Sequence, residues 1–167
     1  KAAPGYIVHR ITAYQVCKKS SRVQGQYTAS SQQESMLRQR GLIDYSPRKA
    51  FRKDLHTFIK SLIDSDHQII LVGDFNEVLG SDHSGMSFLC SEFDLIDVMD
   101  YTHGSDDVPT YSRGPNRLDY CLCTQQAADA IRFAGYEPFC HRMFSDHRGF
   151  FLDFDTTQLF GSDLPSL

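Results

Sequence analysis

The pattern of hydrophobic and polar positions predicts a chain in which strands and helices are interspersed. β-Branched and aromatic residues dominate positions 6–16, which is typical of a strand. Residues 68–73 form a nearly continuous apolar run, the pattern of a strand buried on both faces. Between them, apolar residues recur at helical spacing from the Ser46-Pro47 start to about residue 65. We therefore predict an α/β or α+β fold.

Shorter patterns predict the remaining elements. A helix is expected from Ser30 or Ser31 to Arg40, ended by Gly41. Further helices are expected near 84–92, over 94–101 and, briefly, over 125–130, and strands over 117–123, 131–136 and 149–155. The chain shows no internal repeat and no linker, so we expect residues 1–167 to form a single domain with its core at about 6–155 and a frayed tail over 156–167.

Length and composition agree with one globular domain. The chain has 167 residues, of which 41% are hydrophobic and 23% charged, and no apolar run approaches the length of a membrane span. Lys and Arg number 17 against 21 Asp and Glu, a net charge of −4. This balance argues mildly against wrapping a nucleic acid by charge alone, although a bound divalent cation would reverse the local field. The basic side chains of the helix after Pro47 are expected to form a solvated face; they are Arg48, Lys49, Arg52, Lys53 and Lys60.

Cysteines and the amino terminus bear on the compartment. The five cysteines are odd in number and contain no C-x-x-C pair, which favours reduced thiols over a disulfide or zinc scaffold. Cys121 and Cys123 are two apart and should share one face of a strand. No signal-peptide pattern is seen, so we expect an intracellular, reducing compartment, the nucleus or the cytoplasm. Because the chain begins with Lys1 close to core material, we expect it to be a fragment.

The first chemical motif is Gly73-Asp74-Phe75-Asn76, at the carboxyl end of the buried strand. Asp74 and Asn76 are two residues apart and can project the same way. A carboxylate and a carboxamide converging there can bind a hard cation or hold a water and a phosphate oxygen. The alternative is an Asx-type turn in which both side chains cap backbone groups.

The second motif is Arg117-Leu118-Asp119-Tyr120, at the start of a strand. The Asp119 carboxylate faces away from its two neighbours and can orient an imidazole and stabilise its protonated form. The alternative is a surface salt bridge from Asp119 to Arg113 or Arg117.

The third motif is Ser145-Asp146-His147, just before the last strand. An adjacent Asp and His can place a cation ligand beside a general acid or base, whereas a lone pair of this kind in a loop is usually only exposed. Ser145 lacks the G-x-S-x-G surroundings of a hydrolase nucleophile.

The three motifs in this order resemble the endonuclease/exonuclease/phosphatase family, over roughly residues 6–155. The resemblance implies part of a four-layer α/β sandwich, with two packed, mostly antiparallel sheets flanked by helices. It also implies a divalent-metal-dependent phosphodiester hydrolase using Mg²⁺, or Mn²⁺ in its place.

The resemblance also implies roles for individual residues. Asp74 resembles the aspartate that activates water or binds metal, and Asn76 the asparagine that holds the scissile phosphate near the metal. His147 resembles the histidine that stabilises the transition state or relays a proton, and Asp119 its partner carboxylate. Asp146 resembles the aspartate linked to the metal region, so the implied metal set is Asp146, Asp74 and Asn76. Tyr14 is similar, more loosely, to an active-site tyrosine.

Family domains begin with strands that carry an Asn and a metal-binding Glu. Glu34 lies in a predicted helix and is a poor substitute, so the chain resembles the carboxyl-terminal part of the domain, with the amino-terminal strands missing. We expect the isolated chain to be inactive or nearly so.

The substrate class is less sharply implied. The resemblance as a whole is to exodeoxyribonuclease-like and abasic-endonuclease-like members. The phrase Ile11-Thr12-Ala13-Tyr14 and the residues after it look like retrotransposon-type endonucleases. DNA is therefore the expected partner, with no membrane and no inferable protein partner. The alternatives are a phosphoinositide- or sphingomyelin-type phosphoesterase and a non-catalytic binding relic.

Overall fold

The computed structural model of the chain describes residues 7–18, 28–81, 84–104, 108–141 and 144–161, and within them it confirms the mixed α/β class. In chain order the elements are β1 (Val8–Tyr14), α1 (Ala29–Gln39), α2 (Pro47–Ile63), β2 (Gln68–Asp74), α3 (Gly85–Glu92), β3 (Ile96–Asp97), α4 (Val98–His103), β4 (Asp119–Cys123), α5 (Gln125–Asp129), β5 (Ile131–Tyr136), β6 (Phe150–Phe154) and α6 (Thr156–Phe160).

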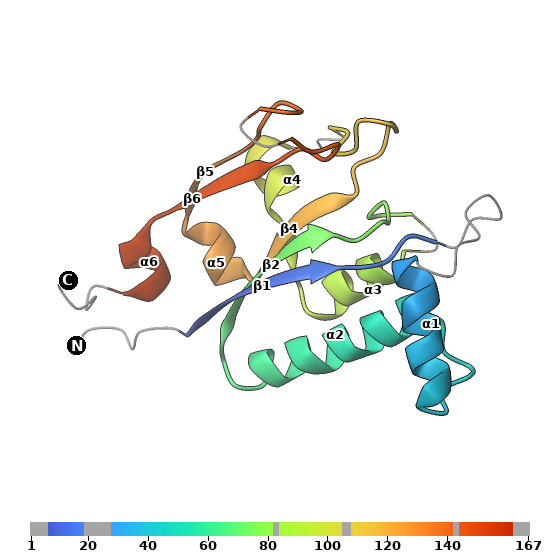
Figure 1. Ribbon diagram of the computed structural model, residues 1–167. Helices are drawn as coiled ribbons and strands as arrows, with labels where there is room; N and C mark the ends of the chain where they lie inside the picture. Colours follow the sequence, from blue (N-terminus) through green and yellow to red (C-terminus); the bar gives the residue numbers. More distant parts are fainter. Residues whose placement is uncertain (1–6, 19–27, 82–83, 105–107, 142–143, 162–167) are drawn as a thin grey trace.

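The strands form two sheets flanked by helices, as expected (Figure 1). The larger sheet has the order β1-β2-β4-β3, and β5 and β6 form the smaller one. Only β1 and β2 pair in parallel among the described strands; β2–β4, β3–β4 and β5–β6 are antiparallel. A parallel pair needs a long crossover, and α1 and α2 supply it between β1 and β2.

Helix starts follow the capping residues that the sequence offers. Ser46 caps α2 by accepting a hydrogen bond from the Lys49 backbone N–H, and Pro47 occupies the first helical position, where no N–H is needed. Ser84 caps α3 in the same way. The helix expected from Ser30 or Ser31 begins slightly earlier, at Ala29, because Thr28 provides the cap.

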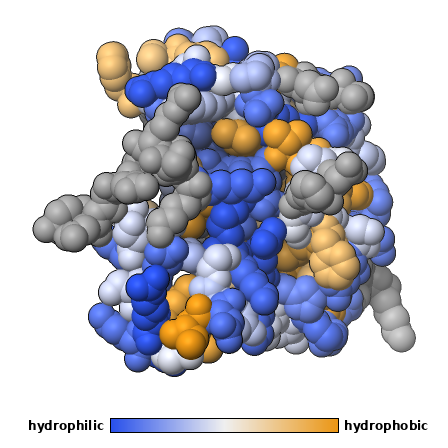
Figure 2. Space-filling model, turned by 90° about the vertical axis from the view of Figure 1, so that its right-hand side faces the viewer, coloured by the Kyte–Doolittle hydropathy of each residue, from blue (hydrophilic) through white to orange (hydrophobic). Residues whose placement is uncertain are grey.

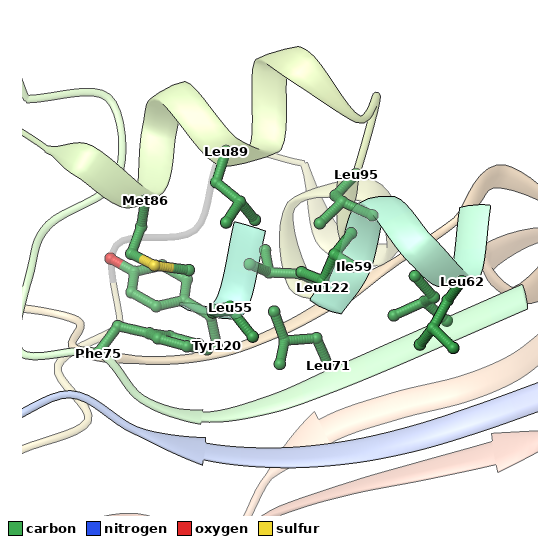
Figure 3. Close-up of a cluster of buried hydrophobic side chains, with 11 residues drawn as sticks. Leu55, Ile59, Leu62, Leu71, Phe75, Met86, Leu89, Leu95, Tyr120 and Leu122 are labelled. Carbon is green, nitrogen blue, oxygen red and sulfur yellow. The ribbon is translucent and has the colours of Figure 1, made fainter. Parts of the chain in front are cut away.

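One hydrophobic core lies between the larger sheet and the helices α2 and α3 (Figure 3). It confirms the helical spacing read from the sequence, because the buried residues of α2 recur at that spacing and face this sheet. The buried members are Leu55, Ile59, Leu62, Ile69, Leu71, Phe75, Met86, Leu89, Leu95, Tyr120 and Leu122.

A second core covers the opposite face of the same sheet, so β2 is buried on both faces, as its apolar run predicted. Cys121 and Cys123 share this face, with their sulfur atoms 3.8 Å apart, and all the cysteines are free thiols. This core draws on α4, α5, α6 and β5 as well; its buried members are Ile70, Val98, Met99, Cys121, Cys123, Ala127, Ala128, Ala130, Ala134 and Leu159.

Two segments differ from the expected elements. The helix expected over 94–101 is instead the short strand β3 followed by α4, because residues Ile96 and Asp97 pair with β4 and Asp97 then caps α4. The tail expected from residue 156 begins as helix α6, because Asp155 caps it and Leu159 is buried in the second core. Residues 162–167 of that tail lie outside the described residues.

Hydropathy adds one further observation. None of the helices in the described segments is long and apolar enough to cross a membrane.

Gly73 is a point where β1 and β2 approach each other very closely. A Cβ at this position would lie 1.8 Å from the backbone oxygen of Ala13. We therefore expect Gly73→Ala to reduce the free energy of unfolding by about 3 kcal/mol, at the upper end of the cost of overpacking, because backbone cannot move aside as a side chain can. Urea unfolding measures this. Gly114→Ala is the matched control, since its nearest neighbour would be 3.6 Å away, and equal losses in both variants would contradict the explanation.

Candidate active site at one edge of the larger sheet

Three predicted site residues lie in one row across neighbouring strands. Tyr14 of β1 is in register with Asp74 of β2, and Asp74 is in register with Asp119 of β4. Side chains alternate along a strand, so Asp74 shares the face of Ile70, and Asp119 the face of Cys121, toward the second core. β1 and β2 end at this edge, and Figure 2 looks onto it: hydrophilic residues occupy the centre of that face and hydrophobic patches surround it.

His147 completes the group from a distant part of the chain. Its Nδ1 lies 2.9 Å from Asp119 Oδ2, and its Nε2 lies 4.0 Å from Asp74 Oδ2. The Tyr111 ring packs against the imidazole at a centroid distance of 5.0 Å. Three potential metal-ligand atoms, one each from Asp74, Asp119 and His147, all lie within 4.8 Å of one another. The structure thus brings together one residue from each of the three motifs.

Thr110 connects the segment of His147 to that of Asp119. Its buried hydroxyl accepts hydrogen bonds from the backbone N–H groups of Leu118, at 2.9 Å, and Asp119, at 3.1 Å. Its carbonyl accepts a hydrogen bond from the Arg148 backbone N–H at 2.8 Å. Nothing in the sequence pointed to this residue, because a single threonine in an aperiodic segment carries no signal of burial.

Asn76 holds the Asp74 carboxylate in place. Its backbone N–H donates to Asp74 Oδ1 at 2.9 Å, and its side-chain Nδ2 donates to Asp74 Oδ2 at 3.0 Å and to the Gln15 carbonyl at 2.8 Å. The first bond is the Asx-type turn that was the alternative interpretation of this motif. The turn also leaves Asp74 Oδ2 4.0 Å from His147 Nε2, so the cation- or phosphate-binding interpretation stays a prediction.

Asp146 lies beside the group and not within it. Its Oδ2 is 3.5 Å from the Arg113 guanidinium, and its carbonyl accepts a hydrogen bond from the Ser112 backbone N–H at 2.8 Å. Tyr14, at the other end of the row, has a half-exposed side chain. Partial burial, and then the charges of Cys17 and Asp74, raise the pKa of the Tyr14 hydroxyl.

The charges of the group perturb two of its members. Burial raises the pKa of Asp74, and the nearby Asp119 charge adds to this, against the hydrogen bonds from Asn76 and the charge of His147. Partial burial alone would lower the pKa of His147, but the hydrogen bond and charge of Asp119, with Asp74 and Asp146, outweigh it and raise that pKa. The imidazole is therefore held toward its protonated form between two carboxylates.

The salt-bridge alternative for Asp119 is not what the structure shows. Arg117 is buried and pairs with Asp97 and, at 2.8 Å, with Asp100. Arg113 contacts Asp146. The described ion pairs leave Asp119 with His147 as its partner.

A buried ion pair supports the loop that carries Asn76, and it corrects one expectation. Arg48 was expected on a solvated basic face, but it is buried, and its guanidinium donates to Glu77, to the Val16 carbonyl at 2.6 Å and to the Asn76 carbonyl at 3.3 Å. Glu77 also accepts bonds from Ser84 and from the Met86 backbone. Because Arg48 lies in the first turn of α2, it faces the loop and not the solvent.

The donor set fits a hard divalent cation. Carboxylate oxygens are the ligands that Mg²⁺ and Mn²⁺ prefer, and Asp74 and Asp119 place two carboxylates within one small group. Magnesium usually keeps several waters and takes only one or two protein carboxylates, so a complete protein cage is not required.

The Asp119–His147 hydrogen bond predicts how His147 titrates. With EDTA present, the NMR signals of His147 are expected to report a pKa above 6.5, so that protonation persists to higher pH than in a free histidine. Asp119→Asn should move that pKa downward, since it removes both the charge and the best acceptor. The signals of His147 are identified as those missing from the spectrum of the His147→Gln variant. A His147 pKa that does not fall in Asp119→Asn would contradict the assigned interaction.

Comparison with known proteins identifies the family. A sequence model described as the Endonuclease/Exonuclease/phosphatase family matches residues 3–147. A search of curated protein sequences found no match. Among solved structures, the chain is similar to the 3′ phosphatase NExo from Neisseria bound to a product DNA hairpin, with 16% identity and a TM-score of 0.53 over 65% of this chain and 53% of that one. The chain thus spans about half the length of that structure, and the likeness concerns the fold. Since the family match extends over most of its length, this chain belongs to the endonuclease/exonuclease/phosphatase family.

Proposed function

We propose that this protein is a divalent-metal-dependent phosphodiesterase that acts on DNA as an endonuclease. The family consists of metal-dependent nucleases and phosphatases, which are hydrolytic enzymes. The observation that carries the proposal is the position of His147, with Nδ1 bound to Asp119 at 2.9 Å and Nε2 directed to Asp74 at 4.0 Å. A phosphodiester is anionic, so a protonated imidazole beside a water-activating carboxylate suits its hydrolysis.

In this proposal each member of the group has a distinct task. Asp119 fixes the tautomer and orientation of His147 by its bond to Nδ1. The free Nε2–H of His147 donates to a phosphate oxygen and stabilises the charge that develops there. Asp74 accepts the proton of the attacking water. In the metal-free protein, burial holds the pKa of Asp74 above its ordinary value.

Asn76 and Tyr14 have supporting tasks. The Asn76 amide donates to the Asp74 carboxylate, so we assign Asn76 first to positioning the base. A rotation of the same amide would let it donate to the scissile phosphate as well. Tyr14 extends the row on the other side of Asp74. Its hydroxyl is protonated near neutral pH, as in any tyrosine, and the upward shift of its pKa keeps it so, which makes it a donor to the substrate.

Asp74, Asn76 and Asp146 are the residues proposed to hold the cation, as the family resemblance implies. Of these, only Asp74 belongs to the group that the structure brings together, and Asp119 is the second carboxylate of that group. When bound, Mg²⁺ or Mn²⁺ neutralises phosphate charge and stabilises the leaving oxygen. To bind the cation, the Asp146 carboxylate must give up its contact with the mostly exposed Arg113 side chain and turn toward the metal.

DNA is preferred as the substrate on two grounds. The similar Neisseria structure is described as holding a DNA hairpin product, and the residues of the motifs resemble exodeoxyribonuclease-like and abasic-endonuclease-like members. The competing substrates are phosphoinositides and sphingomyelin, and the competing role is binding without catalysis.

The test uses the complete natural protein that carries this sequence. Supercoiled plasmid, an oligonucleotide with a 3′ phosphate, inositol polyphosphate and sphingomyelin are each incubated with Mg²⁺ and, separately, with EDTA. Conversion of supercoiled to open-circular plasmid with Mg²⁺ alone is the expected result. Release of phosphate from the lipid-type substrates with the plasmid left intact would refute the DNA assignment, and absence of every activity would favour the binding role.

A further inference from the structure

Phe144 is an unusually exposed aromatic residue close to the candidate site. Its side chain is 102% exposed, the highest value among the exposed large hydrophobic residues that the structure describes. It precedes His147 by only three positions. A ring that is fully in water gains nothing from the fold itself. A single exposed aromatic is ordinary on a protein surface, so its meaning depends on what lies around it.

A cavity of about 200 Å³ adjoins the candidate site on this side. His147 forms part of its lining, and most of its exposed surface is apolar, contributed by residues such as Pro138, Phe150 and Phe151. The cavity is therefore continuous with the group that we propose to act on the phosphate. If a phosphate is bound at His147, the group attached to that phosphate would contact the apolar wall of the cavity.

The residue that follows Phe144 is bonded to the wall of this cavity. The Cys140 thiol, which lines the cavity, donates a hydrogen bond to the carbonyl of Ser145 at 3.5 Å, and Ser145 follows Phe144 directly. The His147 backbone N–H in turn donates to Ser145 Oγ at 3.0 Å. These contacts tie Ser145 both to the cavity and to His147, and they leave the Phe144 ring outside.

We infer that Phe144, together with the apolar wall of this cavity, forms a stacking subsite for an unpaired nucleobase of the nucleotide next to the scissile phosphate. This inference rests on the proposed function and names the feature of the substrate that the site recognises. Exposed aromatic rings bind single-stranded nucleic acids by stacking on bases, and every base offers such a face. An inositol phosphate has no flat aromatic face to offer, so the same features favour a nucleotide over that substrate.

The chain offers a direct reporter, because it contains no tryptophan. Phe144→Trp introduces the one indole of this chain at the subsite, and Phe133→Trp introduces it instead at another exposed aromatic position, 66% exposed and on β5. The probes are a thymidine hexanucleotide and the same backbone with every base replaced by an abasic analogue. All measurements are made at low salt with EDTA, so that binding is observed without hydrolysis.

The expected result is that the thymidine probe quenches the indole fluorescence of the Phe144→Trp variant and the abasic probe does not. The fluorescence of the Phe133→Trp variant should respond to neither probe. In parallel, Phe144→Ala should weaken binding of a fluorescein-labelled thymidine probe about tenfold, within the range measured for loss of one base-stacking residue. Phe133→Ala should not weaken it.

Several results would overturn the inference. These are equal quenching by the two probes, no measurable binding, or an unchanged affinity in Phe144→Ala. A blue shift of the Phe144→Trp emission with phosphatidylserine vesicles and no response to DNA would instead assign Phe144 to a lipid surface. These experiments measure binding and not hydrolysis, so they can be interpreted even if the nicking assay fails. If the natural protein nicks plasmid but Phe144→Ala does not weaken probe binding, only the subsite is refuted and the proposed function stands.

Discussion

Replacing His147 by alanine is expected to reduce Mg²⁺-dependent plasmid nicking by about 10²- to 10⁴-fold, the range that a positioned general acid or base contributes. The imidazole is the only group that contacts Asp119 and faces Asp74 among the described residues, so nothing nearby can take its place. Asp74→Ala should cause a loss of similar size, since it removes the base. Rates are measured in the complete natural protein from the conversion of supercoiled to open-circular plasmid.

The control for this prediction is a second histidine in a comparable setting. His56→Gln also removes a partly exposed imidazole that contacts a carboxylate, that of Glu92 at 2.9 Å, but this pair lies outside the group and outside the adjoining cavity. Its nicking rate should stay within about twofold of the wild type, as expected for a surface ion pair of little energetic weight. Circular dichroism should show that His147→Ala retains its fold, because the side chain is partly exposed. Unchanged nicking by His147→Ala or Asp74→Ala would refute the site assignment.

Replacing Glu77 by glutamine is expected to lower the free energy of unfolding by about 3 kcal/mol, because it leaves a buried guanidinium without its counter-charge. Arg48 and Glu77 are both buried and in contact, and Arg52 adds a second contact at 3.3 Å. The loss is measured by urea unfolding. Asp64→Asn is the matched control: its pair with Lys60 is exposed on both sides, and its removal should cost less than about 1 kcal/mol.

The same variant has a defined pH dependence. Burial alone would raise the pKa of Glu77, but the hydrogen bonds from Met86, Arg48 and Ser84 and the charge of Arg48 hold it below the ordinary value of 4.5. A lowered pKa in the folded state means that ionised Glu77 stabilises the protein fully above pH 4.5, and that this stabilisation is lost as the pH falls through the folded pKa. The gap in unfolding free energy between wild type and Glu77→Gln should therefore narrow on acidification. A gap that widens would contradict the charge-based explanation.

Most elements of the fold could be predicted from local pattern. The long apolar run of β2 and the spacing of Leu55, Ile59 and Leu62 in α2 indicate burial directly, because burial repeats with the period of the element. The segments that differed, β3 with α4 and helix α6, depend on partners elsewhere in the chain. The pairing of β3 with β4 and the packing of Leu159 into the second core have no local signature.

The candidate site divides in the same way. Asp74, Asp119 and His147 could be selected from short motifs, and the structure brings them into one group. Arg48 and Thr110 could not, although they hold the loop and the strand that carry these residues. In the sequence, Arg48 is one basic residue among several on a helix, and only the position of the loop after β2 makes it buried.

The amino-acid sequence by itself determined where most strands and helices form, and which polar residues end the strands, because those features repeat or cap within a few neighbouring residues. Tertiary structure alone decided that strands β1, β2 and β4 align Tyr14, Asp74 and Asp119 in one row and that His147 reaches Asp119 from 28 positions away in the chain. Register between distant strands is set by packing on both faces of the sheet, and no single segment contains that information.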